Sequence, residues 1–280
     1  MTTRSKPVTA RRTLVPLAAV AALVTAFAPQ VSVAASAAKR TSCPPVIAHR
    51  GNGAGAPENT VPAFVNAVRA GAATVELDVR FTRSNLPVVL HDETVDRTTN
   101  GTGPVASMWA RQLRTLRVDV GPNAARLRPR VPSLYRSLRA AKAAGAQRYV
   151  VELKVRSTIG QLYRVLSRFR GVDIERDVVV ESSDAVTLLL VRAAQPELAT
   201  ALLTPRGARP NPADVRRVAT YYLPHYSVVD RYYIEELHAV GLPVYPWTAN
   251  RPRTWRAMTA AGADGIVTDR TRKYLAASCS

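Results

Sequence analysis

The sequence predicts an α/β fold of the TIM type, a (β/α)8 barrel with a hairpin excursion after its second strand. Eight short apolar runs alternate with helical patterns in the part of the chain after residue 41. Strands separated by helices pair in parallel through right-handed crossovers, and eight such units close into a barrel. Only eight residues, Arg80–Pro87, separate Val79 at the end of the second run from Val88. They are too few for a crossover helix, so Pro87–His91 is expected to return as a hairpin.

The individual elements follow from apolar spacing and from the residues that flank each helix. Thr60 is a favourable N-cap for the first helix, and Gly71 lies just past its end. The expected strands are Val46–His49, Thr74–Val79, Tyr149–Lys154, Val178–Ser182, Ala199–Thr204, Leu223–Val229, Pro243–Thr248 and Gly265–Thr268. The expected helices are Val61–Ala70, Ser133–Ala144, Leu162–Phe169, Ala185–Ala194, Asp214–Thr220, Ile234–Val240 and Pro252–Ala261. Two loops are expected, at Asp92–Gly103 and around Asp119–Pro132.

The N-terminus predicts a secretory signal peptide, residues 1–37, followed by a single domain, residues 38–280. A basic start precedes an apolar run, residues 14–29, and then small residues. That is the order of a secretory signal, so a secreted protein is expected. The alternative is a retained membrane anchor. Pro16 interrupts the run, which is also short for a span of about 20 residues, so no stable membrane insertion is expected.

The charge balance favours anionic partners. The chain carries 39 Lys and Arg against 20 Asp and Glu, a formal net charge of +19. Loss of residues 1–37 removes four basic and no acidic residues, which leaves a charge near +15. Nucleic-acid readers interleave basic residues with stacking aromatics. Aromatic residues make up only 6% here, so no nucleic acid is expected. The alternatives are a solvated basic surface and a phosphate-bearing substrate.

The two cysteines, Cys43 and Cys279, lie at the two ends of the expected mature domain. Export permits disulfide formation, and a closed barrel brings its first strand close to its last helix. A disulfide between these residues is therefore expected. The alternative is two free surface thiols.

A glycine-rich stretch after the first strand raises the alternative of a dinucleotide site. Gly51-x-Gly53-x-x-Ala56 fits the fingerprint, and acidic residues follow about 20 residues later. His49 and Arg50, however, occupy the strand end, where a pyrophosphate needs bare backbone. Pro57 also falls where the helix should begin. An oxidoreductase is therefore not favoured.

Ionisable residues gather where the expected strands end. Barrel enzymes place their active groups at the carboxyl ends of the strands. Histidines, carboxylates and basic side chains should therefore meet on one face: His49, Arg50, Glu76, Asp78, Glu152, Lys154, with Ser182 and Trp247 beside them.

Several of these residues belong to an ordered set of motifs. The set comprises AHRG at Ala48–Gly51, PENT at Pro57–Thr60, ELDV at Glu76–Val79, HD at His91–Asp92, DRTTNGTG at Asp96–Gly103, ELK at Glu152–Lys154, WTAN at Trp247–Asn250 and DGIVTD at Asp264–Asp269. In this order the chain resembles the glycerophosphodiester phosphodiesterase family, within the phospholipase C-like barrel superfamily. The resemblance implies a TIM-type barrel, a divalent cation, and hydrolysis of glycerophosphodiesters to glycerol 3-phosphate and an alcohol. The glycines then leave room for a phosphate.

The metal ligands that the resemblance implies are Glu76, Asp78 and Glu152. Glu76 and Asp78 are two residues apart on a strand, so both point to the same face. A donor set of oxygens alone favours Ca2+ or Mg2+ over zinc. The alternative for the first two is a salt bridge to a nearby arginine. Glu58 enters from the first loop and is expected to orient the substrate.

His49 and His91 are expected to be the catalytic acid and base. One takes a proton from the attacking group and the other gives a proton to the leaving oxygen. The attacker is either water or the substrate's own hydroxyl. His238 lies mid-helix and is expected to be structural, whereas His225 could line the cleft.

Three more residues are expected to bind substrate. Arg50 and Lys154 can contact phosphate, the first through a bidentate fork and the second as a point charge. Trp247 is expected to form an apolar wall. The alternatives are a rim salt bridge for the two cations and barrel packing for the tryptophan.

Two departures from the family pattern are visible. Ser84–Pro87 stands where an Asp-Gly turn is usual, and Glu181–Ser183 where Ser-Phe is common. The second departure removes an aromatic wall, so the preference for the leaving alcohol is not predicted. The expected partner is a glycerophosphodiester, a lysophospholipid or a glycerol-phosphate wall polymer, and the protein is expected to be a monomer. A lipid-cyclising enzyme and a non-catalytic binder of anionic surfaces are the remaining alternatives.

Overall fold

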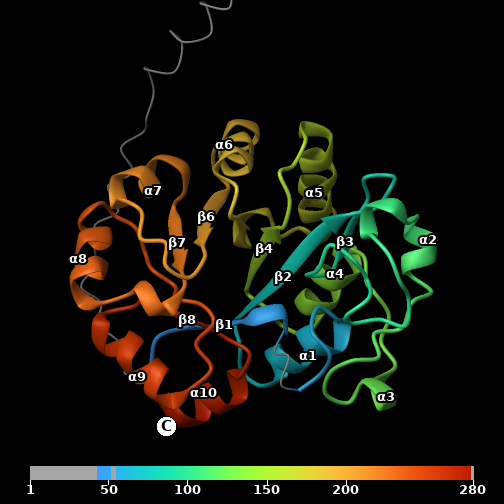
Figure 1. Cartoon of the computed structure of the whole chain (residues 1–280), viewed down its shortest axis with the longest axis horizontal. Helices are drawn as coiled ribbons and strands as arrows, with labels where there is room; N and C mark the ends of the chain where they lie inside the picture. The colour runs from blue at the N-terminus through green and yellow to red at the C-terminus, as the bar shows by residue number, and fades with distance from the viewer. Residues whose placement is uncertain (1–42, 52–54, 279–280) are drawn as a thin grey trace, which may run out of the picture. The chain divides into compact units, whose positions relative to one another are not determined.

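The structure is a computed structural model that describes residues 43–51 and 55–278. Its strands form an eight-stranded sheet that helices surround, the architecture of a TIM-type barrel (Figure 1). The strands are β1 (Val46–Ala48), β2 (Thr74–Phe81), β3 (Pro87–Val89), β4 (Arg148–Leu153), β5 (Val178–Ser182), β6 (Ala199–Thr204), β7 (Tyr221–Pro224) and β8 (Ile266–Thr268). The predicted signal peptide and Cys279 lie outside the described residues, so these predictions and the predicted disulfide stay predictions.

Parallel pairing runs through seven of these strands in the order β7-β6-β5-β4-β2-β1-β8. β4 lies beside β2, with Asp78 opposite Glu152, and β5 lies beside β4, with Glu152 opposite Glu181. The short strand β3 pairs antiparallel with the end of β2. The register therefore places the carboxylates of three adjacent strands at the same level of the barrel.

Residues 244–249 occupy the gap between β7 and β8. Val244 forms a parallel bridge to Tyr222 of β7, and Trp247 forms one to His225, directly after β7. Ala249 N donates to Val267 O of β8 at 2.9 Å. The predicted strand Pro243–Thr248 is thus in the expected place but is not continuous. Proline has no N–H to donate to a ladder, and this stretch contains two prolines, Pro243 and Pro246.

The predicted bounds of the strand Leu223–Val229 are wrong. β7 begins earlier and ends at Pro224, and a 3-10 turn, Tyr226–Val228, follows it. Pro224 has no N–H to donate to the ladder, and His225 N is the next group that donates to β6, to Thr204 O at 3.2 Å. His225 Nδ1 accepts a hydrogen bond from Ser227 N at 3.2 Å, which turns the chain away from the sheet.

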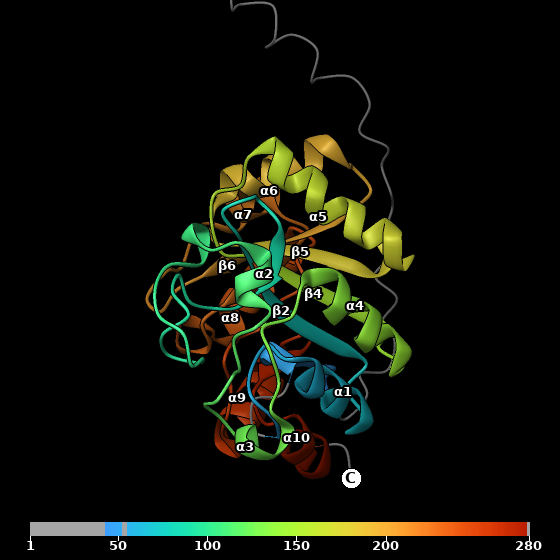
Figure 2. The ribbon, with the colours of Figure 1, turned by 90° about the vertical axis from the view of Figure 1, so that its right-hand side faces the viewer.

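The longer helices surround the strands (Figures 1 and 2); they are α1 and α4 to α10. The α-helices are α1 (Val61–Arg69), α2 (Ala110–Leu113), α3 (Ala124–Leu127), α4 (Leu134–Ala143), α5 (Ile159–Val172), α6 (Ala185–Ala194), α7 (Pro212–Val218), α8 (Arg231–Ala239), α9 (Pro252–Ala261) and α10 (Thr271–Ser278). Thr60 caps α1 as expected, because its Oγ1 accepts a hydrogen bond from Ala63 N. The seven predicted helices are present, and α2, α3 and α10 were not predicted; α3 lies in the stretch that was expected to be a loop.

Two apolar layers hold the barrel together. One lies between the sheet and the helices and includes Phe64, Leu77 and Phe169. The other fills the barrel interior and includes Ile47 and Leu223. Burial of such side chains contributes about 1.5–3 kcal/mol each. This inner layer leaves an open space of about 300 Å3 at the amino ends of the strands, lined in part by Ile47 and Leu223, whereas the inward-facing polar groups of a smaller cleft lie towards the carboxyl ends.

Gly51 is required by its position directly after β1. Its φ of +71° is a left-handed conformation, and a Cβ there would lie 2.5 Å from Phe64 Cδ1 and 2.8 Å from Phe64 N. Gly51→Ala is therefore expected to lower the free energy of unfolding by about 2–4 kcal/mol. Chemical denaturation would measure the change. Gly160→Ala in α5 is the control, since a Cβ there meets nothing within 4 Å, and it should raise the same quantity by up to about 1 kcal/mol. Equal effects of the two substitutions would contradict this account.

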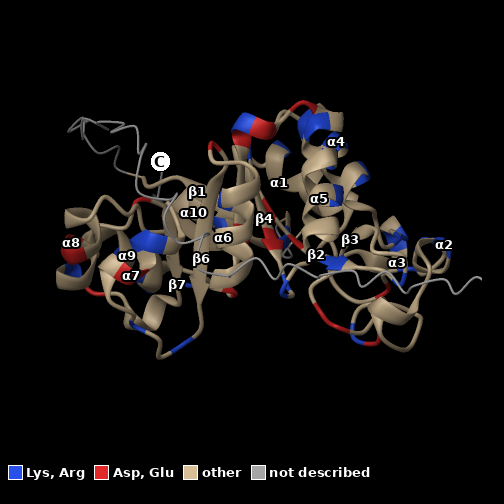
Figure 3. Ribbon diagram, turned by 90° about the horizontal axis from the view of Figure 1, so that it is seen from above, with Lys and Arg blue, Asp and Glu red and all other residues tan. Residues whose placement is uncertain are grey.

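Basic residues are spread over the outer surface, with Lys and Arg on α2, α3 and α4 among other elements (Figure 3). Within residues 43–51 and 55–278, no helix combines the length and the apolarity that crossing a membrane requires.

Candidate active site

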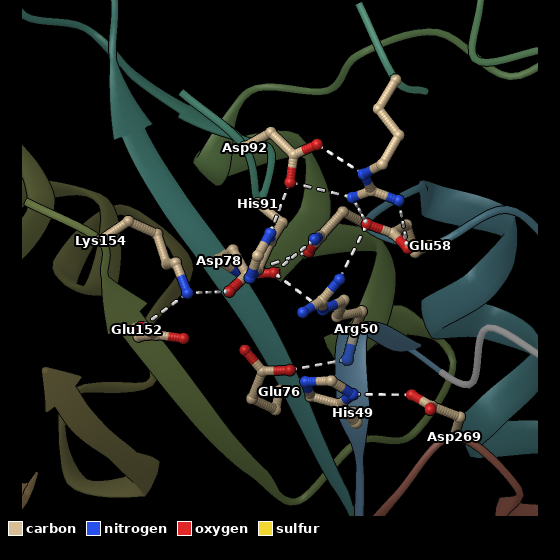
Figure 4. A network of polar contacts seen from close by, with 12 residues as sticks. His49, Arg50, Glu58, Glu76, Asp78, His91, Asp92, Glu152, Lys154 and Asp269 are labelled. Carbon is tan, nitrogen blue, oxygen red and sulfur yellow. Dashed lines mark hydrogen bonds and ion pairs between the residues drawn. The ribbon is translucent and has the colours of Figure 1, made fainter. Parts of the chain in front are cut away.

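A cleft opens where the carboxyl ends of the strands meet (Figure 4). Its polar lining comes mostly from residues that the sequence singled out, and its apolar lining from the barrel interior. The lining residues are His49, Arg50, Glu76, His91, Glu152, Lys154, Glu181, Leu203, Leu223, Trp247 and Val267. The predicted convergence of two histidines, carboxylates and two cations on one face is therefore present.

The backbone after β1 places the first histidine and arginine. His49–Gly51 forms a 3-10 turn in which Arg50 adopts a left-handed conformation, φ 52°. This turn directs Arg50 N towards Glu76, whose Oε2 accepts a hydrogen bond at 2.6 Å. Asn59 N donates to Arg50 O at 3.0 Å, which ties the following loop to the same turn. The strand end and the loop are thus fixed to β2 at the site itself.

Three buried carboxylates form the floor of the cleft. Glu76, Asp78 and Glu152 each offer an oxygen within 4.8 Å of the others, and all three are almost completely buried. Glu76 Oε1 and Asp78 Oδ1 accept no hydrogen bond from the described residues. Buried acceptors are normally satisfied. Three converging carboxylates, two of which keep an oxygen without a hydrogen bond, therefore fit a hard divalent cation.

Basic side chains stabilise the ionised form of the central carboxylate, Asp78. Asp78 Oδ2 accepts from Asn59 Nδ2 at 2.6 Å and lies 3.4 Å from Arg50 Nε. Lys154 Nζ lies 3.5 Å from Asp78 Oδ1 and 2.8 Å from Glu152 Oε1. Burial raises the pKa of Asp78, but the charges of Lys154 and Arg50 outweigh it and lower the pKa below its ordinary value.

The other inward carboxylates respond in the opposite direction. Burial, and then the charge of Asp78, raise the pKa of Glu152 to about 7. The pKa of Glu76 is also raised, by burial and by the Asp78 charge, and that of Glu181 by burial and by Glu152. At neutral pH without a cation, this cluster therefore retains protons that isolated carboxylates would release.

His49 is oriented by an acid that directly follows the last strand, β8. Its Nδ1 lies 2.6 Å from Asp269 Oδ1, and Asp269 Oδ2 accepts from Asn250 Nδ2 at 2.6 Å. Burial raises the pKa of Asp269, but the hydrogen bonds from these two residues lower it below its ordinary value. An ionised carboxylate only accepts, so Nδ1 carries the proton and Nε2 is left for the cleft.

His91 has a matching arrangement on the other side of the cleft. Its Nδ1 lies 2.6 Å from Asp92 Oδ1, and Arg97 donates to the same carboxylate. The hydrogen bonds from Arg97 lower the pKa of Asp92 to about 2. Burial, assisted by the charge of Arg50, lowers the pKa of His91 below its ordinary value, against the opposing charge of Asp78. Two histidines thus present Nε2 to the same cleft, each with its other nitrogen bound to an acid.

Comparison with known proteins identifies this arrangement. Residues 49–273, which span more than half of the chain, match the Glycerophosphoryl diester phosphodiesterase family. The chain belongs to this family. It is 32% identical to a glycerophosphodiester phosphodiesterase of Caldanaerobacter subterraneus subsp. tengcongensis over 229 residues, which cover 80% of this chain and 93% of the relative. The predicted family and enzyme class, a phosphodiester hydrolase, are confirmed.

Two further relatives agree with this membership in the glycerophosphoryl diester phosphodiesterase family. A putative glycerophosphodiester phosphodiesterase of Bacillus subtilis, YhdW, is 33% identical over 240 residues, covering 80% of this chain and 93% of the relative. The crystal structure of a putative glycerophosphoryl diester phosphodiesterase from Silicibacter pomeroyi superposes with a TM-score of 0.74 at 28% identity. That comparison covers 84% of this chain and 93% of the crystallised chain. The barrel fold is thus shown by solved structures of the same family.

Some of the residues predicted for the site do not line the cleft. Glu58 lies beside it and accepts hydrogen bonds from Arg50 at 3.0 Å and from Arg97 at 2.6 Å. His225 packs edge-on against Trp247, and His238 pairs with Asp264 at 2.7 Å. Trp247 lines the cleft, and its Nε1 donates to backbone carbonyls of β6 and β7.

Several residues of the site had no role in the sequence analysis: Asn59, Asp92, Arg97, Asn250, Asp269 and, in the cleft lining, Glu181. The first five lie inside the family motifs quoted above, so the motifs contained the signal. Their roles depend on contacts across the barrel, such as that between His49 and Asp269, 220 residues apart.

Proposed function

We propose that this protein hydrolyses glycerophosphodiesters to glycerol 3-phosphate and an alcohol, with a divalent cation held by Glu76, Asp78 and Glu152. The observation that supports this most directly is the buried triad with its unsatisfied oxygens, placed between two histidines that are each anchored to a carboxylate. All-oxygen ligation favours Ca2+ or Mg2+. When bound, such a cation would neutralise charge on a phosphate oxygen and favour deprotonation of a hydroxyl.

Arg50 and Lys154 would bind the remaining phosphate charge. Both side chains line the cleft. Burial lowers the pKa of Lys154, but the charges of Asp78 and Glu152 raise it above its ordinary value, so it stays protonated. A guanidinium can donate two parallel hydrogen bonds to phosphate oxygens, whereas the ammonium acts as a point charge.

His49 and His91 would move the two protons of the reaction. Each ring presents Nε2 to the cleft, so one can accept a proton from the attacking hydroxyl while the other donates one to the leaving oxygen. The attacking hydroxyl belongs either to water or to the glycerol of the substrate. The acids Asp269 and Asp92 would stabilise the protonated form of each ring.

We further propose that the protein is secreted after removal of residues 1–37 and that Cys43 pairs with Cys279. The order of basic, apolar and small residues at the N-terminus supports export, and export would permit the disulfide.

The test is release of glycerol 3-phosphate from glycerophosphocholine by residues 38–280. Parallel reactions contain EDTA, Ca2+ or Mg2+. Release that depends on the cation is expected. Lysophospholipid and glycerol-phosphate polymer would be assayed in the same way. If none of the three substrates were hydrolysed with either cation, the proposal would be overturned in favour of a non-catalytic binder.

A further inference from the structure

A basic pocket lies outside the catalytic cleft, beside the start of α10. It encloses about 380 Å3. Its lining combines four basic side chains with two amides and one glycine: Arg126, Arg270, Arg272, Lys273, Asn66, Asn123 and Gly55. These residues come from α1, α3, the start of α10 and the loop before α1. α3 and α10 lie at the same edge of the domain in both views, and Figure 1 shows α1 between them (Figures 1 and 2).

The four cations of the basic pocket have no acidic counterpart. No Asp or Glu belongs to the lining, and within residues 43–51 and 55–278 none of the four side chains forms an ion pair. Arginines elsewhere on the surface do pair, as Arg156 does with Asp184 and Arg209 with Asp230. Like charges gathered without a counter-charge repel one another. The pocket is therefore a local centre of positive potential.

The backbone adds to this potential. The first turn of α10 carries Arg272 and Lys273 and no acidic residue. The N-terminus of a helix is already the positive end of its dipole and favours anions. Asn66 and Asn123 contribute amide groups that can donate hydrogen bonds. Cationic, amide and helix-terminal donors around one concave space match the oxygens of a phosphate group.

Two segments that line the basic pocket continue directly from segments that carry groups of the active site. Arg270 directly follows Asp269, the acid that holds His49. Gly55 belongs to the loop that joins the His49–Gly51 turn to Glu58, and its carbonyl accepts from Asn123 Nδ2 at 3.3 Å. The basic pocket shares no lining residue with the catalytic cleft, but two of its residues lie one residue from Asp269 and three residues from Glu58 in the sequence.

We propose that the basic pocket is a second phosphate subsite, which binds a phosphodiester next to the one being cleaved. This rests on the proposed function and narrows its substrate class to chains of glycerol phosphate units that carry several phosphodiesters. A flat anionic membrane fits less well, because surface binding also needs exposed apolar side chains. The large exposed apolar residues of the described part, such as Trp109 and Tyr163, do not line the pocket.

The experiment compares two substrates with one pair of variants. Arg272→Ala/Lys273→Ala removes two exposed charges of the pocket, and Arg164→Ala/Arg170→Ala removes two exposed charges of α5 as a matched control. For a glycerol-phosphate oligomer, kcat/KM of the pocket variant is expected to fall on the order of 10-fold, mainly through KM. For glycerophosphocholine, which has one phosphodiester, it should stay within about 2-fold, and the control variant should change neither.

The dependence of KM on ionic strength provides a second test. The KM of the wild type for the oligomer should rise with salt, and it should rise less in the pocket variant. Equal losses on both substrates, an equal loss in the control, or no loss would overturn the inference. The inference would also be overturned if the pocket variant lost binding to phosphatidylglycerol vesicles while its kcat/KM for the oligomer stayed unchanged. Failure of the proposed function would look different, because the wild type would then cleave neither substrate.

Discussion

Replacing His49 with alanine is expected to lower kcat for glycerophosphocholine by roughly 10²- to 10⁴-fold, the range that a positioned general acid or base contributes. His49 lines the cleft beside Glu76 and Arg50, and its Nδ1 is held by Asp269. The substitution removes Nε2 and leaves the carboxylates and cations in place. KM should therefore change much less than kcat. Steady-state kinetics with saturating cation would measure both.

His238→Ala is the matched control. His238 also hydrogen-bonds an acid, Asp264, at 2.7 Å, but it does not line the cleft. Its loss should leave kcat within about 2-fold of the wild type, as for most surface substitutions. Comparable losses in the two variants would show that His49 acts through the stability of the fold.

Asp269→Asn separates orientation from proton transfer. An amide cannot stabilise a protonated ring as a carboxylate does, so a loss on the order of 100-fold in kcat is expected. Combined with His49→Ala, the same substitution should cost little more, because the two residues act as a unit. Additive losses in the double variant would instead give Asp269 a separate role.

The barrel itself could be predicted because its signals are local. Apolar runs and helix-flanking residues such as Thr60 and Gly262 define most elements within a residue or a few. The exceptions arise where proline limits hydrogen bonding. β7 ends at Pro224, earlier than expected, and the stretch that contains Pro243 and Pro246 forms isolated bridges in place of the next strand. A pattern of apolar residues does not show which backbone groups have partners.

The site could be predicted only in part, for a different reason. Residues at strand ends, such as His49 and Glu152, follow from the barrel topology, because parallel strands bring their carboxyl ends together. The acids that orient the histidines depend on pairings between distant segments. Glu181 was noted only as a departure from the family pattern. Its inward position and its unsatisfied Oε2 become apparent once β5 is placed beside β4.

Glu181 and Glu152 provide a test of the cation site, because they form a matched pair. They lie opposite each other on β4 and β5, both are buried, and burial raises the pKa of both. Only Glu152 belongs to the triad. Glu152→Gln and Glu181→Gln are both expected to raise the melting temperature in EDTA at pH 7, because each removes a buried carboxyl group whose pKa is raised in the folded state and which therefore lowers stability at this pH.

The pH dependence has a definite sign. The pKa of Glu152 is about 7 in the folded protein, against an ordinary value of 4.5. Between these values the folded state holds a proton that the unfolded state has released, so stability falls as the pH rises from about 4.5 to 7. The contribution is on the order of 2–3 kcal/mol. In Glu152→Gln this loss should be absent, and thermal unfolding at several pH values in EDTA would measure it.

The cation distinguishes the two variants. A ligand that binds only the folded state raises its stability by RT ln(1 + [L]/Kd), so Ca2+ or Mg2+ should raise the melting temperature of the wild type. Glu181→Gln should keep this rise and Glu152→Gln should lose most of it, whereas Glu197→Gln, at an exposed position, should behave as the wild type. If both buried variants lost the rise, the cation would be held by four carboxylates. A rise retained in Glu152→Gln would show that this cation does not bind at the triad, because removal of one of three converging oxygens must weaken ligation.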